Sequence, residues 1–330
     1  MPDTTVYFAT NRKPDTHVPG GFGADIVADP THITYAVVPV TGTDLSDASS
    51  GQLGTITAVS DGGFASTVQA ELENTGKNLL VFIHGFDNSF LDAIKRSAFN
   101  RAWFADSGIA GTDTTVVAFT WPSSGNLIGS LPHPPDAAYL QDMAMAGASG
   151  ASVAAFLHNV LQLVVQTRDA GRRSFLLAHS MGNHALAAAI ANGMQPGANQ
   201  YDEAILAGAD EVFTTLETPG IGMYDLRDLA KRLSVYYSRR DIAMDLSRCV
   251  NHNQRLGFDG PENKIDEQIY EPATFRSVDC TDVYDYPSFL PIDATHQYYR
   301  RSKTVRTDIV KLMANQPVEP GVSRLSHYLL

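Results

Sequence analysis

One serine stands in a setting that is typical of a catalytic nucleophile. Residues 178–182 (AHSMG) follow an apolar run at 174–178 and precede a helical pattern at 183–192. A sharp turn between a strand and a helix exposes the Ser180 hydroxyl at the sheet edge, where a base can take its proton. The usual pattern has glycine two positions before the serine, and the small Ala178 stands here instead. The alternative is a serine that only caps the helix.

The base for this serine should be one of the histidines late in the chain. In proteins with such a turn, the chain order is serine, acid and then histidine. His252 follows the stronger acid candidate, Asp241, by only eleven residues, which is too short for another strand and a return to the site. His327 lies in the C-terminal tail, and chain ends are poorly tied down. His296, between the last predicted strand and a terminal helix, is therefore the predicted base.

Two aspartates follow predicted strands and could orient this histidine. Asp210 comes after the apolar segment 203–207, and Asp241 after the segment 233–238. The carboxylate must hold the imidazole in one tautomer and stabilise its charged form, so it must lie beside the histidine loop. Asp241 is nearer to His296 in strand order and is the predicted acid, which leaves Asp210 as a capping aspartate.

Backbone amides are predicted to bind the oxyanion of the reaction. Residues 84–86 (HGF) end the apolar run 79–83, at the place where such a loop approaches the serine turn. The N–H groups of Phe86 and Met181 would converge on the substrate oxygen, with an effect of about 3 kcal/mol for each donor. His84 is interpreted as a buried histidine that bonds to local backbone, without a role in proton transfer.

Apolar residues after another strand are candidates for the substrate pocket. Trp121 ends the strand pattern at 116–121, and Leu127 and Ile128 follow in a loop rich in glycine and proline. These three residues are predicted to bind the acyl group of a substrate, and simple packing is the alternative.

Strand and helix patterns that could position these residues alternate from residue 76 on. This alternation indicates a mainly parallel sheet with helices on both faces. The predicted strands are 79–83, 116–121, 174–178, 203–207, 233–238 and 275–280, and helices begin near 89, 153, 183 and 298. We expect residues 76–330 to form the catalytic domain. Residues 1–75 carry β-branched runs at 5–10 and 33–40 and are predicted to be a β-rich N-terminal extension packed on the core.

Composition and charge exclude several classes of partner. Of the 330 residues, 44% are hydrophobic, which is enough for one large α/β domain. The net charge of −12 argues against nucleic acid and anionic membranes as partners. The longest apolar run, at 185–191, has seven residues, whereas a transmembrane helix needs about 20. The N-terminus lacks the basic and apolar regions of a signal peptide, so we expect a cytoplasmic protein.

The sequence predicts neither a cofactor nor a metal ion. His179 and His184 do not belong to a His-Glu-x-x-His pattern, and there is no Walker A pattern or glycine-rich dinucleotide pattern after a strand. Cys249 and Cys280 are the only cysteines, which excludes a disulfide scaffold and a four-cysteine zinc site. A single bridge between them stays open, beside the alternative of two ordinary thiols.

Taken together, these motifs resemble a known family. The chain is similar to the bacterial esterase/lipase-like α/β-hydrolases long catalogued as a domain of unknown function, through 6–12 (VYFATNR), 80–90 (LVFIHGFDNSF), 119–125 (FTWPSSG), 176–186 (LLAHSMGNHAL), 236–244 (YYSRRDIAM) and 296–302 (HQYYRRS). The resemblance implies an α/β-hydrolase fold with Ser180 as nucleophile, Asp241 as acid and His296 as base. The segment 256–293 is less typical of the family.

These observations predict a serine hydrolase that cleaves small-molecule carboxylic esters through an acyl-enzyme. Short to medium acyl chains are expected because no long apolar lid is visible. An amidase or a thioesterase would use the same three residues, and a non-catalytic binding protein of this fold is the alternative from another class. The oligomeric state stays open.

Overall fold

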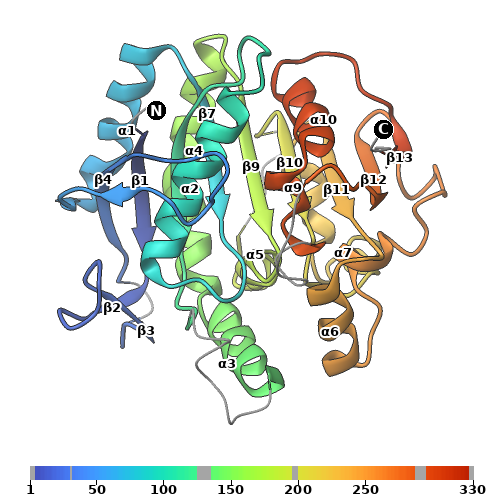
Figure 1. The fold of residues 1–330 in the computed structure, drawn as a ribbon, viewed down its shortest axis with the longest axis horizontal. Helices are drawn as coiled ribbons and strands as arrows, with labels where there is room; N and C mark the ends of the chain where they lie inside the picture. The colour runs from blue at the N-terminus through green and yellow to red at the C-terminus, as the bar shows by residue number, and fades with distance from the viewer. Residues whose placement is uncertain (1–3, 30–31, 125–134, 195–199, 287–294, 327–330) are drawn as a thin grey trace.

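In the computed structural model, residues 4–29, 32–124, 135–194, 200–286 and 295–326 are described. Within these residues, eleven strands form one sheet that crosses the molecule (Figure 1). Their spatial order is β13 (Gly321–Ser326), β12 (Phe275–Asp282), β11 (Leu233–Tyr237), β10 (Glu203–Ala207), β9 (Ser174–His179), β7 (Asn78–Ile83), β8 (Thr114–Thr120), β1 (Thr4–Thr10), β4 (Thr34–Thr41) and β5 (Gln52–Leu53), with β6 (Thr57–Val59) also on β4. Neighbours from β13 to β1 pair in parallel, which confirms the predicted mainly parallel α/β fold.

The central strands are buried on both faces because helices cover both sides of the sheet. In β7, Leu79, Val81 and Ile83 belong to a hydrophobic cluster with α1 (Asp61–Thr75), α4 (Gly150–Asp169) and α5 (Gly182–Ala191). Leu80 and Phe82 point to the other face, into a cluster with α2 (Phe90–Ala105) and α10 (Lys303–Met313). This explains why β7 is a continuous apolar run rather than an alternating one. Burying one such side chain contributes about 2 kcal/mol.

The N-terminal segment contributes strands to the same sheet. β1 pairs in parallel with β8, from Val6 opposite Val116 to Thr10 opposite Thr120, and β4 pairs antiparallel with β1. These are the strands predicted near 5–10 and 33–40. β2 (Arg12–Pro14) and β3 (Phe22–Ile26) form a small separate sheet. A division of the chain after residue 75 stays a prediction.

Several elements differ from the expected pattern. The segment expected to be β-rich contains α1, in which Phe64, Val68 and Leu72 are buried on one face. Its first turn holds Gly62 and Gly63, which weaken the local helix signal. The terminal helix expected from residue 298 begins there but is divided at Ser302 into α9 (Tyr298–Arg301) and α10. Further helices without a prediction are α3 (Pro135–Ala148), the 3₁₀ helix η1 (Tyr224–Asp228), α6 (Ile242–Asn251) and α7 (Leu256–Asp259).

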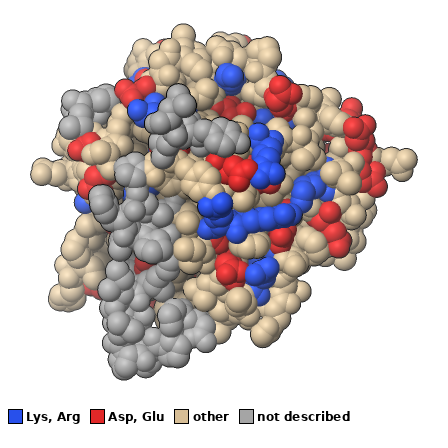
Figure 2. Space-filling view, turned by 45° about the vertical axis from the view of Figure 1, so that its right-hand side comes forward, with Lys and Arg blue, Asp and Glu red and all other residues tan. Residues whose placement is uncertain are grey.

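Charged residues are unevenly spread over the surface. Figure 2 shows lysine and arginine side chains gathered in a band on the side of the molecule where β12 and β13 lie, with acidic side chains around it. The excess of acidic residues that gives the net charge of −12 is therefore not spread evenly over the surface.

Among the described helices, none is by itself both long enough and apolar enough to cross a membrane. The bent pair of Ala137–Ala148 and Gly150–Asp169, with 49° between its halves, reaches the required length and composition only when the two are taken together.

Candidate active site

Ser180 occupies a strained turn between β9 and α5. Its φ is +55°, in the left-handed region that side chains other than glycine rarely adopt. The Ser180 N–H donates to the carbonyl of Ala207 at the end of β10 (2.9 Å), and its carbonyl accepts from Asn183 N–H (3.0 Å). A Cβ at Gly182 would lie 2.5 Å from the His84 carbonyl oxygen. Glycine at position 182 therefore lets the start of α5 lie this close to the end of β7.

His296 and Asp241 form a buried hydrogen-bonded pair. Asp241 caps the N-terminus of α6 by accepting the Met244 N–H at Oδ1 (3.0 Å), and Oδ2 accepts Nδ1–H of His296 (2.7 Å). With the proton on Nδ1, Nε2 of His296 is left as an acceptor, which is the tautomer that a base requires. Burial raises the pKa of Asp241, and the hydrogen bond from His296 opposes that change.

This pair lies beside the serine turn. A Cβ at Gly208 would lie 3.3 Å from Cε1 of His296 and 3.4 Å from Oδ2 of Asp241, and Gly208 follows the Ala207 that accepts the Ser180 N–H. Within the described residues, the Ser180 hydroxyl makes no hydrogen bond, although the side chain is almost fully buried. Such contacts are often long in an unliganded enzyme and shorten when substrate is bound.

His179, just before the serine, contacts the same histidine. Because a carbonyl oxygen only accepts, Nε2–H of His179 donates to the His296 carbonyl (3.3 Å). The ring centroids of His296 and Tyr299 both lie 4.6 Å from that of His179. Burial, together with the nearby His296, holds the pKa of His179 well below its usual value. His179 therefore acts as a neutral support for the His296 backbone, a role that the sequence analysis missed.

The predicted oxyanion donors lie in two turns, the N–H of Phe86 in the loop after β7 and the N–H of Met181 in the serine turn after β9. No described residue accepts a hydrogen bond from the N–H of Phe86 or of Met181, so both amides are available to a ligand. The Asn88 side chain donates to the carbonyls of Gly85 (2.8 Å) and Phe86 (2.7 Å). A Cβ at Gly85 would lie 2.6 Å from Cβ of Ser180, which shows how closely this loop approaches the serine.

A buried arginine from the N-terminal segment holds this loop. Arg12 donates to the carbonyls of Asn88 (2.8 Å) and Ser123 (3.2 Å) and to the Thr120 hydroxyl (2.8 Å). Its side chain is 1% exposed, and burial lowers the pKa of its guanidinium, against the attraction of Asp142. A buried charge is tolerated only where hydrogen bonds compensate for the lost water, so we expect these hydrogen bonds to fix the loop in place.

His84 and Trp121 lie beneath the loop. The Trp121 indole donates to the His84 carbonyl (2.7 Å), and the two rings stack with centroids 5.0 Å apart. Nδ1–H of His84 donates to the Gly85 carbonyl (2.9 Å), which confirms its predicted bonding to local backbone. Burial holds the pKa of His84 well below its usual value. Trp121 is fully buried and its predicted contact with substrate stays a prediction; Leu127 and Ile128 lie outside the described residues.

The alternative acid and bases occupy other environments. Asp210 accepts the hydroxyl protons of Tyr139 (2.8 Å) and Ser247 and lies 3.4 Å from Nε of Arg255. The structure thus pairs Asp241, not Asp210, with His296. His252 follows α6 as its exposed C-cap, and His327 lies outside the described residues.

The structure also describes both cysteines and the possible metal ligands. Cys249 and Cys280 are both free, the first exposed and the second buried. Among the residues that the structure describes, no three histidine, cysteine or acidic side chains are arranged to hold a metal ion.

Comparison with known proteins places most of the chain in a family. No match was found among the curated proteins. A family model described as "Alpha/beta hydrolase of unknown function (DUF900)" matches residues 61–315, about three quarters of the chain. The match runs from α1 to the end of α10 and includes Ser180, Asp241 and His296. The chain therefore belongs to this family of α/β hydrolases of unknown function.

Proposed function

We propose that the protein is a serine hydrolase that cleaves carboxylic esters of small molecules. The observation that carries the proposal is the Asp241–His296 hydrogen bond of 2.7 Å beside the strained turn of Ser180. A serine, an imidazole in the basic tautomer and two unengaged backbone amides are the groups that acyl transfer needs. Membership of an α/β-hydrolase family supports hydrolysis as the class of reaction.

In the first half of the reaction, Nε2 of His296 takes the proton of Ser180 as Oγ attacks the ester carbonyl carbon. The negative charge that develops on the carbonyl oxygen is stabilised by the N–H groups of Phe86 and Met181 and by the N-terminus of α5. The Asp241 carboxylate stabilises the imidazolium of His296 without taking its proton. The tetrahedral intermediate then breaks its bond to the alcohol, which leaves with the proton from His296.

In the second half, water replaces the alcohol. His296 takes a proton from the water, whose oxygen attacks the acyl carbon of the ester on Ser180. Collapse of the second intermediate releases the carboxylic acid, and His296 returns its proton to Ser180. Each proton that leaves is restored, so the cycle needs no cofactor.

The test is hydrolysis of p-nitrophenyl esters with acyl chains of two to twelve carbons by wild type and Ser180→Ala. We expect activity on the shorter chains, and a fall in turnover of about 10⁵-fold in the variant, because the nucleophile is lost. Circular dichroism and the thermal midpoint should show that the variant is folded. Unchanged turnover in a folded Ser180→Ala variant would overturn the assignment.

The same panel tests the bond that is cleaved. Matched thioester and anilide substrates with the preferred acyl group would carry the same acyl contacts and differ only in the leaving group. Ester hydrolysis faster than both supports the proposal, whereas faster cleavage of an anilide or thioester would make the protein an amidase or a thioesterase.

A further inference from the structure

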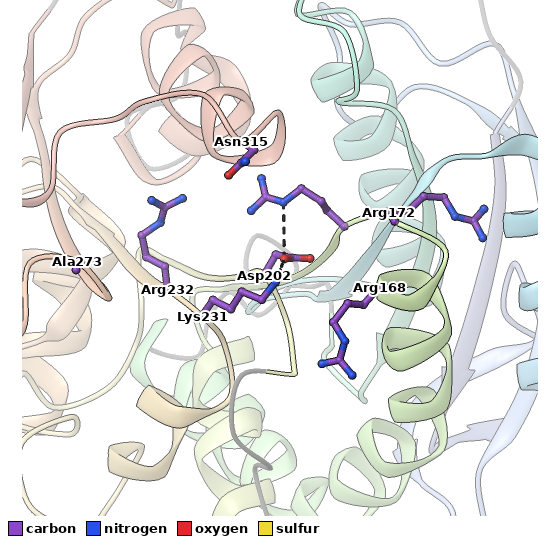
Figure 3. A pocket seen from close by; sticks show the side chains of 9 residues that line it. Arg168, Arg172, Asp202, Lys231, Arg232, Ala273 and Asn315 are labelled. Carbon is purple, nitrogen blue, oxygen red and sulfur yellow. Dashed lines mark hydrogen bonds and ion pairs between the residues drawn. The ribbon is translucent and has the colours of Figure 1, made fainter.

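A cationic cavity lies at the edge of the sheet opposite to Ser180. It has a volume of about 510 Å³ and lies at the amino ends of β9, β10 and β11 (Figure 3). The residues used below are Arg168, Arg172, Arg173, Asp202, Lys231 and Arg232, with Asn315 at the rim. The volume is within the range of small-molecule sites, about 300–1,000 Å³.

Parallel pairing brings these side chains together from distant parts of the chain. Arg173 directly precedes β9, Asp202 precedes β10, and Lys231 and Arg232 precede β11. Because neighbouring strands start at the same edge, residues far apart in sequence share one surface. Arg168 comes from the last turn of α4 and completes the group.

The cavity carries a surplus of positive charge. The five cations that line it have three carboxylates within 4 Å: Asp202 at 2.8 Å from Lys231, Glu203 at 2.7 Å from Arg232, and Asp169 at 3.9 Å from Arg168. Five positive and three negative charges leave a surplus of two when all are ionised. Burial raises the pKa of Glu203 to about 7, so at neutral pH the surplus is larger still.

Two of the cations have structural tasks. Arg173 donates to the carbonyls of Leu312 and Met313 at the end of α10, and Arg172 donates to the Leu72 carbonyl near the end of α1. Cations are favoured at helix C-termini, so these contacts explain both residues without a ligand. Figure 3 shows the Arg172 side chain pointing away from Asp202.

The other three cations have side-chain N–H groups that donate no hydrogen bond to the described residues. In the described part of the chain, Arg232 donates only from Nε, to Glu203, and Arg168 donates no side-chain hydrogen bond. Lys231 donates one bond, to Asp202 (2.8 Å). The side chains of Arg168 and Lys231 are 42% and 53% exposed, so solvent and solutes reach them. In Figure 3, Arg232 and Arg168 lie on opposite sides of Asp202.

We propose that this cavity binds a small molecule through a phosphate or diphosphate group. A phosphate group carries up to two negative charges and several strong acceptor oxygens, which matches a surplus of two charges and the unused donors of Arg168, Lys231 and Arg232. The guanidinium fork of Arg232 suits two oxygens at once, and Lys231 adds a point charge. The limited volume and the net charge of −12 favour a small ligand over an extended polyanion.

The experiment is isothermal titration calorimetry of the full chain with inorganic pyrophosphate at constant ionic strength. We expect saturable one-to-one binding that weakens about tenfold or more in Arg168→Gln/Lys231→Gln, because two charge-assisted contacts are lost. Both side chains are about half exposed, so the variant should fold, and its thermal midpoint checks this. The control is Lys303→Gln/Arg324→Gln, which removes the same charge outside the cavity and should bind like wild type.

Two further titrations identify the kind of anion. A phosphate monoester such as glycerol phosphate should compete with pyrophosphate if the site accepts an organic phosphate, and failure to compete would restrict the site to inorganic diphosphate. Citrate carries similar charge on carboxylates; equal binding of citrate would overturn the assignment to phosphate. Absence of saturable pyrophosphate binding to wild type, or equal weakening in both double variants, would overturn the site itself.

Discussion

At the two edges of the parallel sheet, the functional side chains lie beside opposite ends of helices. At the carboxyl edge, Ser180 and Asp241 lie where α5 and α6 begin, and Asp241 accepts the N–H of Met244. At the amino edge, Arg173 lies where α10 ends and donates to its last carbonyls. A helix that connects parallel strands runs back against them, so helix N-termini gather at one edge and C-termini at the other.

The helix dipoles account for much of this difference. In the proposed mechanism, the oxyanion of the tetrahedral intermediate would be stabilised by backbone amides and a helix N-terminus, with no cationic side chain among its proposed donors. At the amino edge the helix ends are negative, and arginines neutralise them. At the amino edge, contacts with helix-end carbonyls explain Arg172 and Arg173. In the described part of the chain, the side chains of Arg168, Lys231 and Arg232 meet carboxylates and donate to no helix carbonyl, so the helix ends do not explain them.

The largest effect at the carboxyl edge is expected from Asp241→Asn. The amide cannot hold the imidazole of His296 in the basic tautomer, so turnover should fall about 10⁴-fold while the protein stays folded. Steady-state kinetics on the best p-nitrophenyl ester measures the loss.

Asp210→Asn is the matched control for this prediction. Asp210 accepts hydrogen bonds from Tyr139 and Ser247 and lies beside Arg255. Its loss leaves the buried Arg255 guanidinium without its carboxylate and should lower the free energy of unfolding by about 3 kcal/mol. Turnover of the folded protein should change far less than in Asp241→Asn. A larger loss of turnover in Asp210→Asn would mean that the acid is Asp210.

Arg12→Lys should give the next largest effect. Lysine keeps the charge but cannot reach Asn88, Ser123 and Thr120 together, so the loop that carries the Phe86 amide would shift. Loss of one oxyanion donor lowers kcat about 100-fold, and KM should change little because the contact strengthens in the transition state.

Arg276→Lys separates this positioning role from simple loss of stability. Arg276 is also fully buried and donates to Asp308 (3.0 Å) and to the Glu319 carbonyl (2.8 Å), but it lies near the amino end of β12. It should lower the thermal midpoint and leave kcat near wild type. If both arginine variants lose stability and neither loses kcat, Arg12 is only a structural residue.

The sequence was informative where local pattern determines structure. Apolar runs and the small residues around Ser180 located the strands and the turn, and strand order pointed to Asp241 beside His296, the two residues that the structure pairs. Helix α1 was missed because Gly62 and Gly63 weaken its first turn. Strand β13 was missed because its two large apolar residues, Val322 and Leu325, are three positions apart and give no alternating apolar pattern.

Contacts between distant segments were beyond such reasoning. Arg12 meets Asn88 and Thr120 across 76 and 108 residues of chain, and no local pattern signals that meeting. The cationic cavity is of the same kind, since Arg168 and Arg232 share it only because β9 and β11 flank β10. His179 had a local signal, its place next to the nucleophile, but its contact with His296 depends on the fold.

The smallest effect on turnover is expected from Glu203→Gln, which should change the pH dependence of stability instead. Burial raises the pKa of Glu203 from 4.5 to about 7, against the attraction of Arg232. Between these values the folded protein holds a proton that the unfolded chain has released, so the free energy of unfolding falls as pH rises from about 5 to 8. A change of this size corresponds to about 3 kcal/mol. Glutamine has no such proton, so urea unfolding of Glu203→Gln should show a fall smaller by about that amount.

Ser180→Ala serves as the control at the carboxyl edge, since it changes no titrating carboxyl and should keep the full pH dependence. Turnover of Glu203→Gln at pH 8 should stay within about twofold of wild type, because sites this far apart act nearly independently. An equal fall with pH in wild type and Glu203→Gln would show that Arg232 keeps Glu203 ionised throughout. The amino-edge cavity would then keep a surplus of two positive charges at every pH above 5, and anion binding there would not depend on protonation of Glu203.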